Sequence, residues 1–575
     1  MANEITCEKI FVGKVFGDMW FSIPAYQRPY VWGKDQVTDL LDDVVEAMRG
    51  SDMDEYFIGS LVIRPVEILD NHQKDNGQKA YIENEILDGQ QRLTTLLLIF
   101  AALRDLTEEE DSRSACAEAI FMKGSKAKNI PERMRINFQI RDAAQGFLEN
   151  LKKLGHTKVL AAEEDENIED ISVRNMANTL FEIRKFIEEQ SVDVDALIGY
   201  LWQKVSLIYV STEQLNDAIR LFNVLNNRGI PLRNSDILKS LNLDVVTSEK
   251  DKAKYALLWE ETENALGDEF DRFLGHIRTM LVKEKARTGL LQEFEEKIYK
   301  PRTKKSPVLL EKGKATFDMV ARHRKHFETL FSNENFKPQF QHQLDNLIFI
   351  MSEGFPSTDW IPPMLMYFDK FRFEQLLEFL ECLDNRFSSD WIQGYTPTER
   401  IEEMNDLLKV IEAADTPDRV LEYQNLYLDE EEWEELLAIM SGKVYGKRYA
   451  RYLLLKLNYL NGSKSQKMYF SRMSIEHILP QNPKKGSAWM SNFNDEERIE
   501  LTHCIGNLVI IGRGKNSSLS NADFPEKMER YLKSSLETIP HTLKVLNKKK
   551  AWNSNNIRAA QVTSLNQLKD HYLAE

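Results

Sequence analysis

The C-terminal fold is decided by Met473-Ser-Ile-Glu-His-Ile-Leu-Pro-Gln481 and, about twenty residues further on, by Leu501-Thr-His-Cys-Ile-Gly-Asn-Leu-Val-Ile-Ile-Gly512. Both stretches are short, apolar and rich in β-branched residues, which is typical of strands. A helical pattern follows over residues 524–536. The expected order is therefore strand, strand, helix, a small ββα unit.

The polar residues of this unit are those that phosphodiester hydrolysis requires, namely a base for the attacking water and a cation for the leaving oxygen. His477 is the candidate base, because a neutral imidazole accepts a proton near pH 7. Glu476 and Asn516 offer the oxygen ligands that Mg²⁺ or Mn²⁺ prefers. Asn507, after Gly506, would hold the loop that follows His477 by side-chain hydrogen bonds to its backbone. Together these parts match the frame of a one-metal HNH (ββα-metal) nuclease.

Neighbouring residues on a strand point to opposite faces, so Glu476 and His477 can share a site only if the strand ends or bends there. Pro480 makes an end at this place plausible. The alternatives are a surface Glu-His pair and a Gly-Asn that merely forms a turn. His503 is a second imidazole without an acid beside it, and we interpret it as structural or supporting. Arg513, Lys515 and Lys527 are candidates for contacts with DNA phosphates, with a solvated loop as the alternative.

Length and charge limit the possible architectures. A chain of 575 residues exceeds one core, so two to four domains are expected. The net charge is −16, but residues 471–575 hold 15 Lys and Arg against 11 Asp and Glu, a net of +4 that leaves −20 for the rest. A basic module on an acidic body is compatible with DNA binding. No apolar run is long enough for a membrane span, no signal sequence is evident, and four scattered cysteines fit a reducing cytoplasm.

The pattern along the chain predicts an α+β multidomain protein. Residues 11–23, 56–66 and 201–210 are interpreted as strands, residues 36–48 as a helix, and residues 84–99 as a strand, a polar loop and a helix. Amphipathic helices follow one another from about residue 248 to residue 460. We therefore predict an α/β domain over residues 1–245, an all-α region over residues 246–460 and the ββα module over residues 461–575.

Two tracts near the N-terminus are unusually polar for their context, Ile23-Pro-Ala-Tyr-Gln-Arg-Pro-Tyr-Val-Trp32 and Leu87-Asp-Gly-Gln-Gln-Arg-Leu-Thr-Thr95. The second opens a helix, where backbone N–H groups suit an anion such as phosphate. Arg28 and Arg92 could add charge-assisted contacts, and Asp88 could hold a cation or activate water. The alternative is a buried hydrogen-bond cluster that joins strand and helix, with Asp88 as the helix cap.

The C-terminal motifs resemble the HNH domain of the GmrSD family of prokaryotic type IV restriction systems, which act against phages with modified DNA. The resemblance rests on Glu476-His-Ile-Leu-Pro-Gln481, Ile505-Gly-Asn-Leu508 and Asn516-Ser-Ser-Leu-Ser-Asn521 with Phe524 and Lys527. It implies His477 as general base, Glu476 and Asn516 near the metal, and Asn507 as the positioning residue.

The N-terminal tracts, together with Phe222-Asn-Val-Leu-Asn-Asn-Arg-Gly-Ile-Pro-Leu232 and Asp236-Ile-Leu-Lys239, are similar to the ParB-like N-terminal domain of the same family. That domain is associated with binding and hydrolysis of a nucleoside triphosphate, GTP or another. The resemblance implies a phosphate-handling set of Gln27, Arg28, Asp88, Gly89, Gln90, Gln91, Arg92, Asn226, Arg228 and Gly229, with Asp88 also catalytic. The helical middle resembles no family that we can name.

The expected function is a nucleotide-regulated, metal-dependent endonuclease or nickase that cleaves modified double-stranded phage DNA in the cytoplasm. A homodimer is possible, and no membrane partner is expected. Two alternatives remain: an N-terminal domain that senses DNA or a partner without hydrolysing nucleotide, and a ribonuclease or non-catalytic scaffold.

Overall fold

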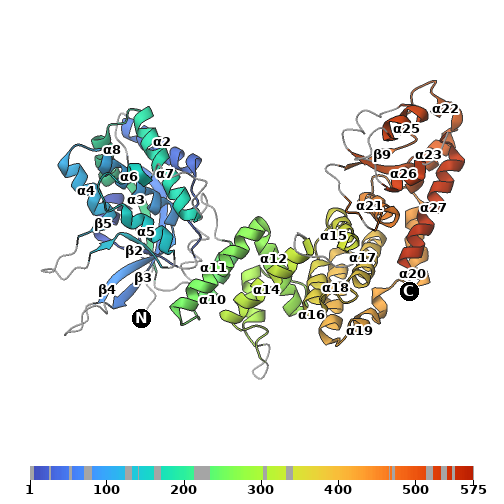
Figure 1. Cartoon of the computed structure of the whole chain (residues 1–575), viewed down its shortest axis with the longest axis horizontal. Helices are drawn as coiled ribbons and strands as arrows, with labels where there is room; N and C mark the ends of the chain where they lie inside the picture. Colours follow the sequence, from blue (N-terminus) through green and yellow to red (C-terminus); the bar gives the residue numbers. More distant parts are fainter. Residues whose placement is uncertain are drawn as a thin grey trace. The chain divides into compact units, whose positions relative to one another are not determined.

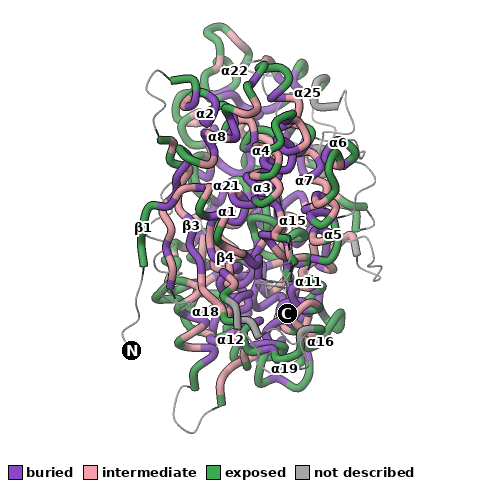
Figure 2. Tube along the Cα trace, turned by 90° about the vertical axis from the view of Figure 1, so that its left-hand side faces the viewer, coloured by how far each residue is buried: buried purple, intermediate pink, exposed green. Residues whose placement is uncertain are grey.

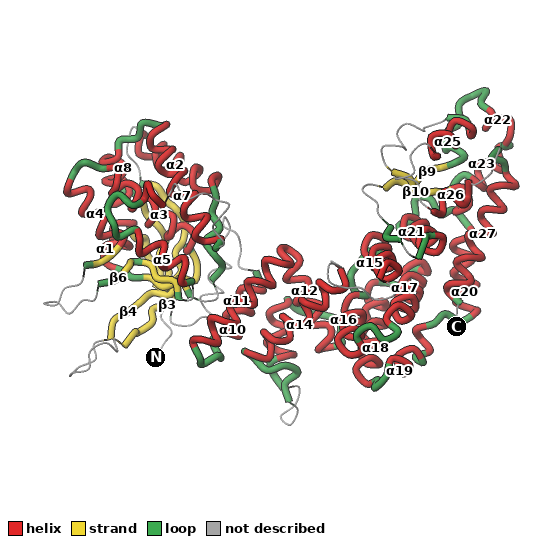
Figure 3. The backbone as a smooth tube through the Cα atoms, viewed as in Figure 1, coloured by secondary structure: helices red, strands yellow, loops and turns green. Residues whose placement is uncertain are grey.

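The computed structural model describes most of the chain in two compact units. The described residues are 6–24, 27–50, 55–69, 80–123, 132–139, 141–160, 170–212, 233–301, 307–331, 341–464, 466–468, 473–512, 522–532, 540–546 and 551–573. The first unit comprises residues 1–271 and 312–317, and the second comprises residues 272–311 and 318–575. In Figure 3 the strands gather in the first unit and in one small pair within the second.

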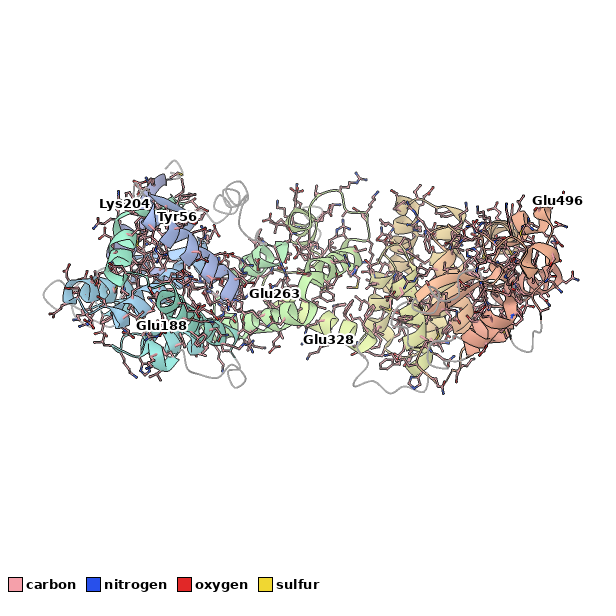
Figure 4. The ribbon with its side chains drawn as sticks, turned by 90° about the horizontal axis from the view of Figure 1, so that it is seen from above. Tyr56, Glu188, Lys204, Glu263, Glu328 and Glu496 are labelled. Atoms are coloured by element: carbon pink, nitrogen blue, oxygen red, sulfur yellow. The ribbon has the colours of Figure 1, made fainter. Side chains whose placement is uncertain are left out.

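A mixed six-stranded sheet forms the centre of the first unit, in the order β1-β8-β3-β4-β2-β7. Its strands are β1 (Thr6–Phe11), β2 (Phe21–Ile23), β3 (Tyr56–Leu69), β4 (Ala80–Asp88), β7 (Ile136–Phe138) and β8 (Val205–Ser211). β3 is antiparallel to β4 and parallel to β8, and β2 is parallel to both β4 and β7. Where β3 begins, the Tyr56 N–H donates to the Lys204 carbonyl (3.0 Å), and both residues are labelled in Figure 4.

Helices and this sheet together enclose a continuous apolar core, whose residues have the colour of buried residues in Figure 2. They are α1 (Val12–Asp18), α2 (Lys34–Arg49), α3 (Gln90–Leu106), α4 (Glu110–Ile120), α5 (Asp142–Asn150), α6 (Thr157–Leu160), α7 (Ile171–Glu189) and α8 (Val194–Gln203). Two further helices of the first unit, α10 (Asn234–Leu243) and α11 (Glu249–Leu266), contribute no described residue to this core. The centre of α3 is buried on all sides, as a helix apolar around its whole circumference should be. A short pair, β5 (Phe121–Met122) with β6 (Arg133–Met134), lies apart from the main sheet.

The predicted strand over residues 11–23 is wrong in its middle, where α1 forms instead. Val12, Val15 and Phe16 are buried on one face of α1, a spacing that fits a helix and not a strand. The other N-terminal predictions are confirmed to within a few residues: the strands β3 and β8, the helix α2, and the strand–loop–helix of β4 and α3.

The middle of the chain is helical throughout its described residues, as expected (Figure 1). The helices are α12 (Phe270–Val282), α13 (Leu290–Glu293), α14 (Lys314–Phe331), α15 (Gln341–Gly354), α16 (Ile361–Phe371), α17 (Leu376–Gln393), α18 (Pro397–Ala413), α19 (Pro417–Leu421), α20 (Glu430–Ser441) and α21 (Ala450–Asn461). No described helix combines the length and the apolar character needed to cross a membrane.

The C-terminal module follows the predicted order of strand, strand and helix. β9 (Met473–His477) pairs antiparallel with β10 (Leu508–Gly512). The helix α25 (Phe524–Leu532) contributes Phe524 to the apolar core of this module, to which β10 contributes Val509 and Ile511. Between the strands lie α22 (Ala488–Asn492), α23 (Asp495–Leu501) and the 3₁₀ turn η5 (Ile505–Asn507), and after α25 come α26 (Pro540–Leu546) and α27 (Ser554–Tyr572). The predicted helix over residues 524–536 is thus described as far as Leu532.

Candidate functional sites

β9 ends at His477, which lies opposite Leu508 on β10. The next residue already leaves the ladder, and the Ile478 N–H donates to the carbonyl of Asn507 (3.1 Å). A strand that ends here frees His477 from the strict alternation of a continuing strand. The end of the strand that we expected near Pro480 is therefore present.

Asn507 holds the backbone that follows His477, as expected. Its side-chain oxygen accepts from the Leu479 N–H (2.8 Å), and its amide nitrogen donates to the Leu479 carbonyl (3.0 Å). The same amide donates to the Thr502 carbonyl (2.8 Å), and the Trp552 indole donates to the Asn507 oxygen (3.2 Å). Asn507 is completely buried, so these bonds lie away from water, where an unmade bond is costly.

The imidazole of His477 is neutral and surrounded by three polar or aromatic neighbours. Its Nε2 lies 3.2 Å from Nδ1 of His503, and its Nδ1 lies 3.3 Å from the Gln481 amide nitrogen. An amide nitrogen can only donate, so Nδ1 of His477 is the acceptor and Nε2 carries the proton. Burial, with smaller effects from His503 and Lys527, lowers the pKa of His477 to about 3. The ring of Tyr445 crosses that of His477 edge-on at 4.2 Å between centroids.

Glu476 forms a buried ion pair with Lys527 of α25. The Lys527 ammonium donates to a Glu476 carboxylate oxygen and to the His477 carbonyl, both at 2.7 Å. Burial lowers the pKa of Lys527, and the Glu476 carboxylate opposes that shift. The predicted role of Lys527 as a surface contact for DNA is wrong, because its side chain is wholly enclosed.

The donors expected of a metal site do not come together in the described part of the chain. A divalent cation at Glu476 would meet a carboxylate of which one oxygen already accepts from the ammonium of Lys527. Over the described residues, no group of three or more His, Cys, Asp and Glu side chains is placed to hold a metal ion. Asn516, the other predicted ligand, lies outside the described residues, as do Arg513 and Lys515.

The N-terminal tracts meet where β4 gives way to α3. The Gln27 amide donates to the carbonyls of Ile86 (3.2 Å) and Leu87 (2.9 Å), and the Gln90 amide donates to the Arg28 carbonyl (3.0 Å). Gln91 accepts from the Val31 N–H (2.8 Å) and donates to the Pro29 carbonyl (3.0 Å). The first tract is therefore bound to the second chiefly through side-chain amides, the buried cluster that we considered as the alternative.

Asp88 lies at the centre of this junction, next to two glycines with positive φ. Its carboxylate accepts from Arg92 (3.3 Å) and Ser60 (3.2 Å), and burial nevertheless raises its pKa. The helix cap is Gly89 (φ 96°) and not Asp88. A Cβ on Gly59 (φ 109°) would come within 2.2 Å of the Arg92 guanidinium, so only glycine leaves room for Arg92.

A second cluster of charges, missed in the sequence, lies beside this junction. Arg141 donates to the Gln27 carbonyl (2.6 Å) and to Glu260, which also accepts from the buried Lys239 (3.0 Å). Burial raises the pKa of Asp236, and the charge of Arg28 counteracts the rise there as it does at Asp88. A cavity of about 450 Å³ opens here, bounded by Pro29, Arg141, Ser172 and Glu260 among others. The signal in the sequence was weak, because Arg141 and Glu260 stand in separate helical segments without a motif.

The structure brings together seven of the predicted nucleotide residues: Gln27, Arg28, Asp88, Gly89, Gln90, Gln91 and Arg92. The remaining three, Asn226, Arg228 and Gly229, lie outside the described residues. Burial raises the pKa of Glu263 on α11, and its neighbours include Asp236 and Lys239 (Glu263 is labelled in Figure 4).

Comparison with known families assigns both ends of the chain. Residues 8–243 match the model described as "GmrSD restriction endonuclease, N-terminal domain", and residues 428–563 match "GmrSD restriction endonucleases, C-terminal domain". Residues 305–436, between them, match a family of unknown function, DUF7834. A search of curated proteins gave no match. The C-terminal match begins well before β9, so it includes α20, α21 and the turn that carries Tyr445.

Proposed function

Because the chain belongs to the GmrSD restriction endonuclease family, we propose that it is a metal-dependent endonuclease or nickase that hydrolyses modified double-stranded DNA and is regulated by a nucleotide. Restriction endonuclease activity in defence is the role of the family. Beyond this family role, we propose the identity of the base, an HNH class for the C-terminal module, a bound metal, modified DNA as the substrate and regulation by a nucleotide.

A single observation carries the proposal: a neutral, enclosed imidazole at the end of β9, with its loop held by Asn507. An imidazole with a low pKa stays unprotonated at neutral pH, so its lone pair is free to accept a proton, although the same burial makes it a weaker base than an exposed histidine. Nδ1 of His477 is the basic atom, since Nε2 donates to His503. Its neighbour, the Gln481 amide, is 3.3 Å away, a long contact that a water molecule can replace.

In the proposed reaction, Nδ1 of His477 takes a proton from the attacking water while the water oxygen forms a bond to phosphorus and the ester oxygen leaves. The Gln481 amide, which can only donate, keeps the proton off Nδ1, and His503 accepts the Nε2 hydrogen bond. When bound, Mg²⁺ or Mn²⁺ supplies a Lewis acid for the leaving oxygen. Glu476 and Asn516 are the proposed ligands, and a cation at Glu476 would share the carboxylate with Lys527 or displace it.

Nucleotide regulation is proposed for the junction around Asp88. Arg28, Arg92 and Arg141 gather positive charge at the start of α3, where backbone N–H groups also favour an anion. One observation favours the rival function, a sensing domain that does not hydrolyse nucleotide: the amides of Gln27, Gln90 and Gln91 already bond to the protein's own backbone.

The test is cleavage of unmodified and modified phage DNA, and of RNA, by the purified full chain with Mg²⁺, Mn²⁺ or EDTA and with each nucleoside triphosphate. We expect metal-dependent DNA cleavage that His477→Ala abolishes, while far-UV circular dichroism and the melting temperature stay near those of the parent. His503→Ala should slow cleavage and shift its pH profile. Unchanged cleavage by His477→Ala would refute the assignment of the base.

The proposed regulation by a nucleotide is tested with a separate variant. Asp88→Ala should change nucleotide turnover and the nucleotide dependence of cleavage, with basal cleavage retained. If cleavage is independent of every nucleotide and no nucleotide binds, the N-terminal domain is a sensor of the rival kind. Cleavage of RNA in preference to DNA would show that RNA is the substrate and would overturn the proposal of DNA.

A further inference from the structure

A turn outside the ββα unit, residues 442–448 between α20 and α21, lies against the histidines of the nuclease site. The Val444 and Tyr445 N–H groups both donate to the His503 carbonyl, at 2.9 and 3.1 Å. The Tyr445 ring stacks on His503 with centroids 5.5 Å apart and meets the His477 ring at 4.2 Å. The turn is therefore part of the wall around the proposed base.

The backbone holds this turn in one shape. The Lys447 N–H donates to the Val444 carbonyl (3.1 Å), and Gly446 between them has a φ of 84°, the geometry of a turn that needs glycine at its third position. Val444 is completely buried, and the side chain of Gln561 on α27 donates to the carbonyl of Ser441 at the start of the turn (3.0 Å). The backbone positions from which the exposed side chains of the turn extend are consequently fixed.

The exposed side chains of the turn are cationic. Lys443, Lys447 and Arg448 all lie at the surface, and none of them forms an ion pair with a described residue. Lys443 is close enough to lower the pKa of His503, after the larger effect of burial. The sequence around the turn has no compensating acid: eight Lys and Arg and no Asp or Glu stand between Glu435 and Glu476.

We propose that Lys443, Lys447 and Arg448 bind the phosphate backbone of DNA next to His477, with Tyr445 as a positioning residue for the imidazole. This inference rests on the proposed function and supplies the contacts that Lys527, enclosed and paired with Glu476, does not provide. A strand cut at His477 must pass its neighbouring phosphates close to the site. DNA carries about one charge per 1.7 Å of helix axis, so three cations on one short turn can meet several phosphates.

The experiment measures binding of a fluorescent DNA duplex by anisotropy over a range of KCl concentrations. All proteins carry His477→Ala so that the duplex stays intact. Each lost phosphate contact reduces the slope of log K against log salt by about 0.9, so K443Q/K447Q/R448Q should flatten it by about 2 to 3. The loss of affinity should be similar for unrelated sequences.

The matched control removes two exposed cations of the same unit, in K409Q/R419Q. Lys409 pairs with Asp406 (2.7 Å) and Arg419 with Glu422 (2.8 Å), so both are already balanced by acids. This variant should keep the parent's affinity and salt slope. In otherwise active protein, K443Q/K447Q/R448Q should raise the KM for DNA with kcat little changed, and Tyr445→Ala should lower kcat and shift its pH profile while Tyr445→Phe restores both.

The outcomes separate the two proposals. If the parent cleaves and binds DNA but the triple variant has the parent's slope and affinity, the turn is not the contact and the inference falls while the nuclease assignment stands. If the parent neither cleaves nor binds DNA, the proposed function fails. Binding of RNA in preference to the duplex, lost in the triple variant, would overturn the choice of DNA as the partner.

Discussion

At the scale of single residues, buried polar groups organise the nuclease site. Asn507 uses its amide on both backbone groups of Leu479, and the donor amide of Gln481 determines which nitrogen of His477 carries a proton. Lys527 is in the same way enclosed and paired with Glu476. The side chains nearest the proposed base thus serve first to position it, and the contacts with substrate come from elsewhere.

Asn507→Ala should destabilise the protein and slow cleavage. It leaves the N–H and carbonyl of Leu479 without their partner, and each buried group without a partner costs about 1–3 kcal/mol. Urea unfolding should show the loss, and cleavage measured well below the unfolding transition should still be slower, because the His477 loop is no longer held. Asn492→Ala, at an exposed position of α22, should change stability by less than about 0.5 kcal/mol. An Asn507→Ala protein with the parent's stability would contradict the role of these bonds.

The Lys527→Met variant should unfold more easily than the double variant that carries both Lys527→Met and Glu476→Gln. The single change leaves the Glu476 carboxylate buried without its cation, at a cost of about 3–5 kcal/mol, whereas the double change removes both charges. Thermal melts of the two single variants and the double variant give the coupling energy. If the double variant regains stability but not cleavage, Glu476 has a role beyond the ion pair; equal melting temperatures for the Lys527→Met and double variants would show that the pair is not the source of stability.

At the scale of elements, α27 packs against η5, the turn that contains Asn507. Its first turns approach η5 so closely that the Gly506 N–H donates to the Gln561 side chain (2.8 Å), and Trp552, just before the helix, reaches Asn507. Its last turn is bound to α17, where the Tyr572 hydroxyl lies 2.7 Å from the Ser388 hydroxyl and Asn385 donates to the His571 carbonyl (2.9 Å). One helix therefore connects η5 and Asn507 to the helical region of the same unit.

Gly506→Ala should displace α27 and weaken both stability and cleavage. A Cβ at this position would lie 2.5 Å from the Ile557 carbonyl oxygen and 2.6 Å from the Gln561 nitrogen, backbone atoms that can move only with the helix. The expected loss is about 1–3 kcal/mol, the usual cost of overpacking. Gly275→Ala is the control, since a Cβ there meets no atom within 4 Å and alanine favours a helix by about 0.5–1 kcal/mol. Equal melting temperatures for the two variants would show that a Cβ at residue 506 does not clash with the backbone of α27.

At the scale of the whole molecule, buried histidines of the second unit and buried carboxyls of the first unit should respond to acid in opposite directions. In the second unit, burial is the main cause that lowers the pKa of His276, His323 and His541 to about 4 and of His477 to about 3. In the first unit, burial is the main cause that raises the pKa of Glu83, Asp88 and Asp236. Protonation of these histidines therefore acts against the folded state of the second unit, and protonation of these three carboxyls acts in favour of that of the first.

The second unit should lose stability as the pH falls from about 6.5 toward 4. The unfolded histidines bind protons below pH 6.5 while the folded ones do not until about pH 4, so each removes up to about 1.4 kcal/mol of stability per pH unit in that window. Hydrogen exchange at pH 7.5, 5.5 and 4.5, corrected for intrinsic rates, should show protection lost first in the core helices of the second unit. Earlier loss in the first unit would contradict the assignment.

Local pattern by itself determined most of the elements and supplies the prediction that His477 is the base. The alternation around Glu476 and His477, the Gly-Asn before β10 and the apolar residues of α3 each specify their own conformation through contacts with near neighbours in the chain. The misassigned segment, α1, is short, so that a period of two and a period of 3.6 are hard to distinguish in it. The HNH and ParB-like classes and the three domain boundaries stay predictions.

Only the tertiary structure decided what surrounds these elements. Tyr445 reaches His477 from a turn between two helices, Trp552 reaches Asn507 from a later segment, and Arg141 and Glu260 meet although 119 residues separate them. It also decided that Lys527 is enclosed, although its sequence context is polar. The physical reason is that periodicity records which face of an element is buried, whereas the identity of the partner on that face depends on how distant elements pack.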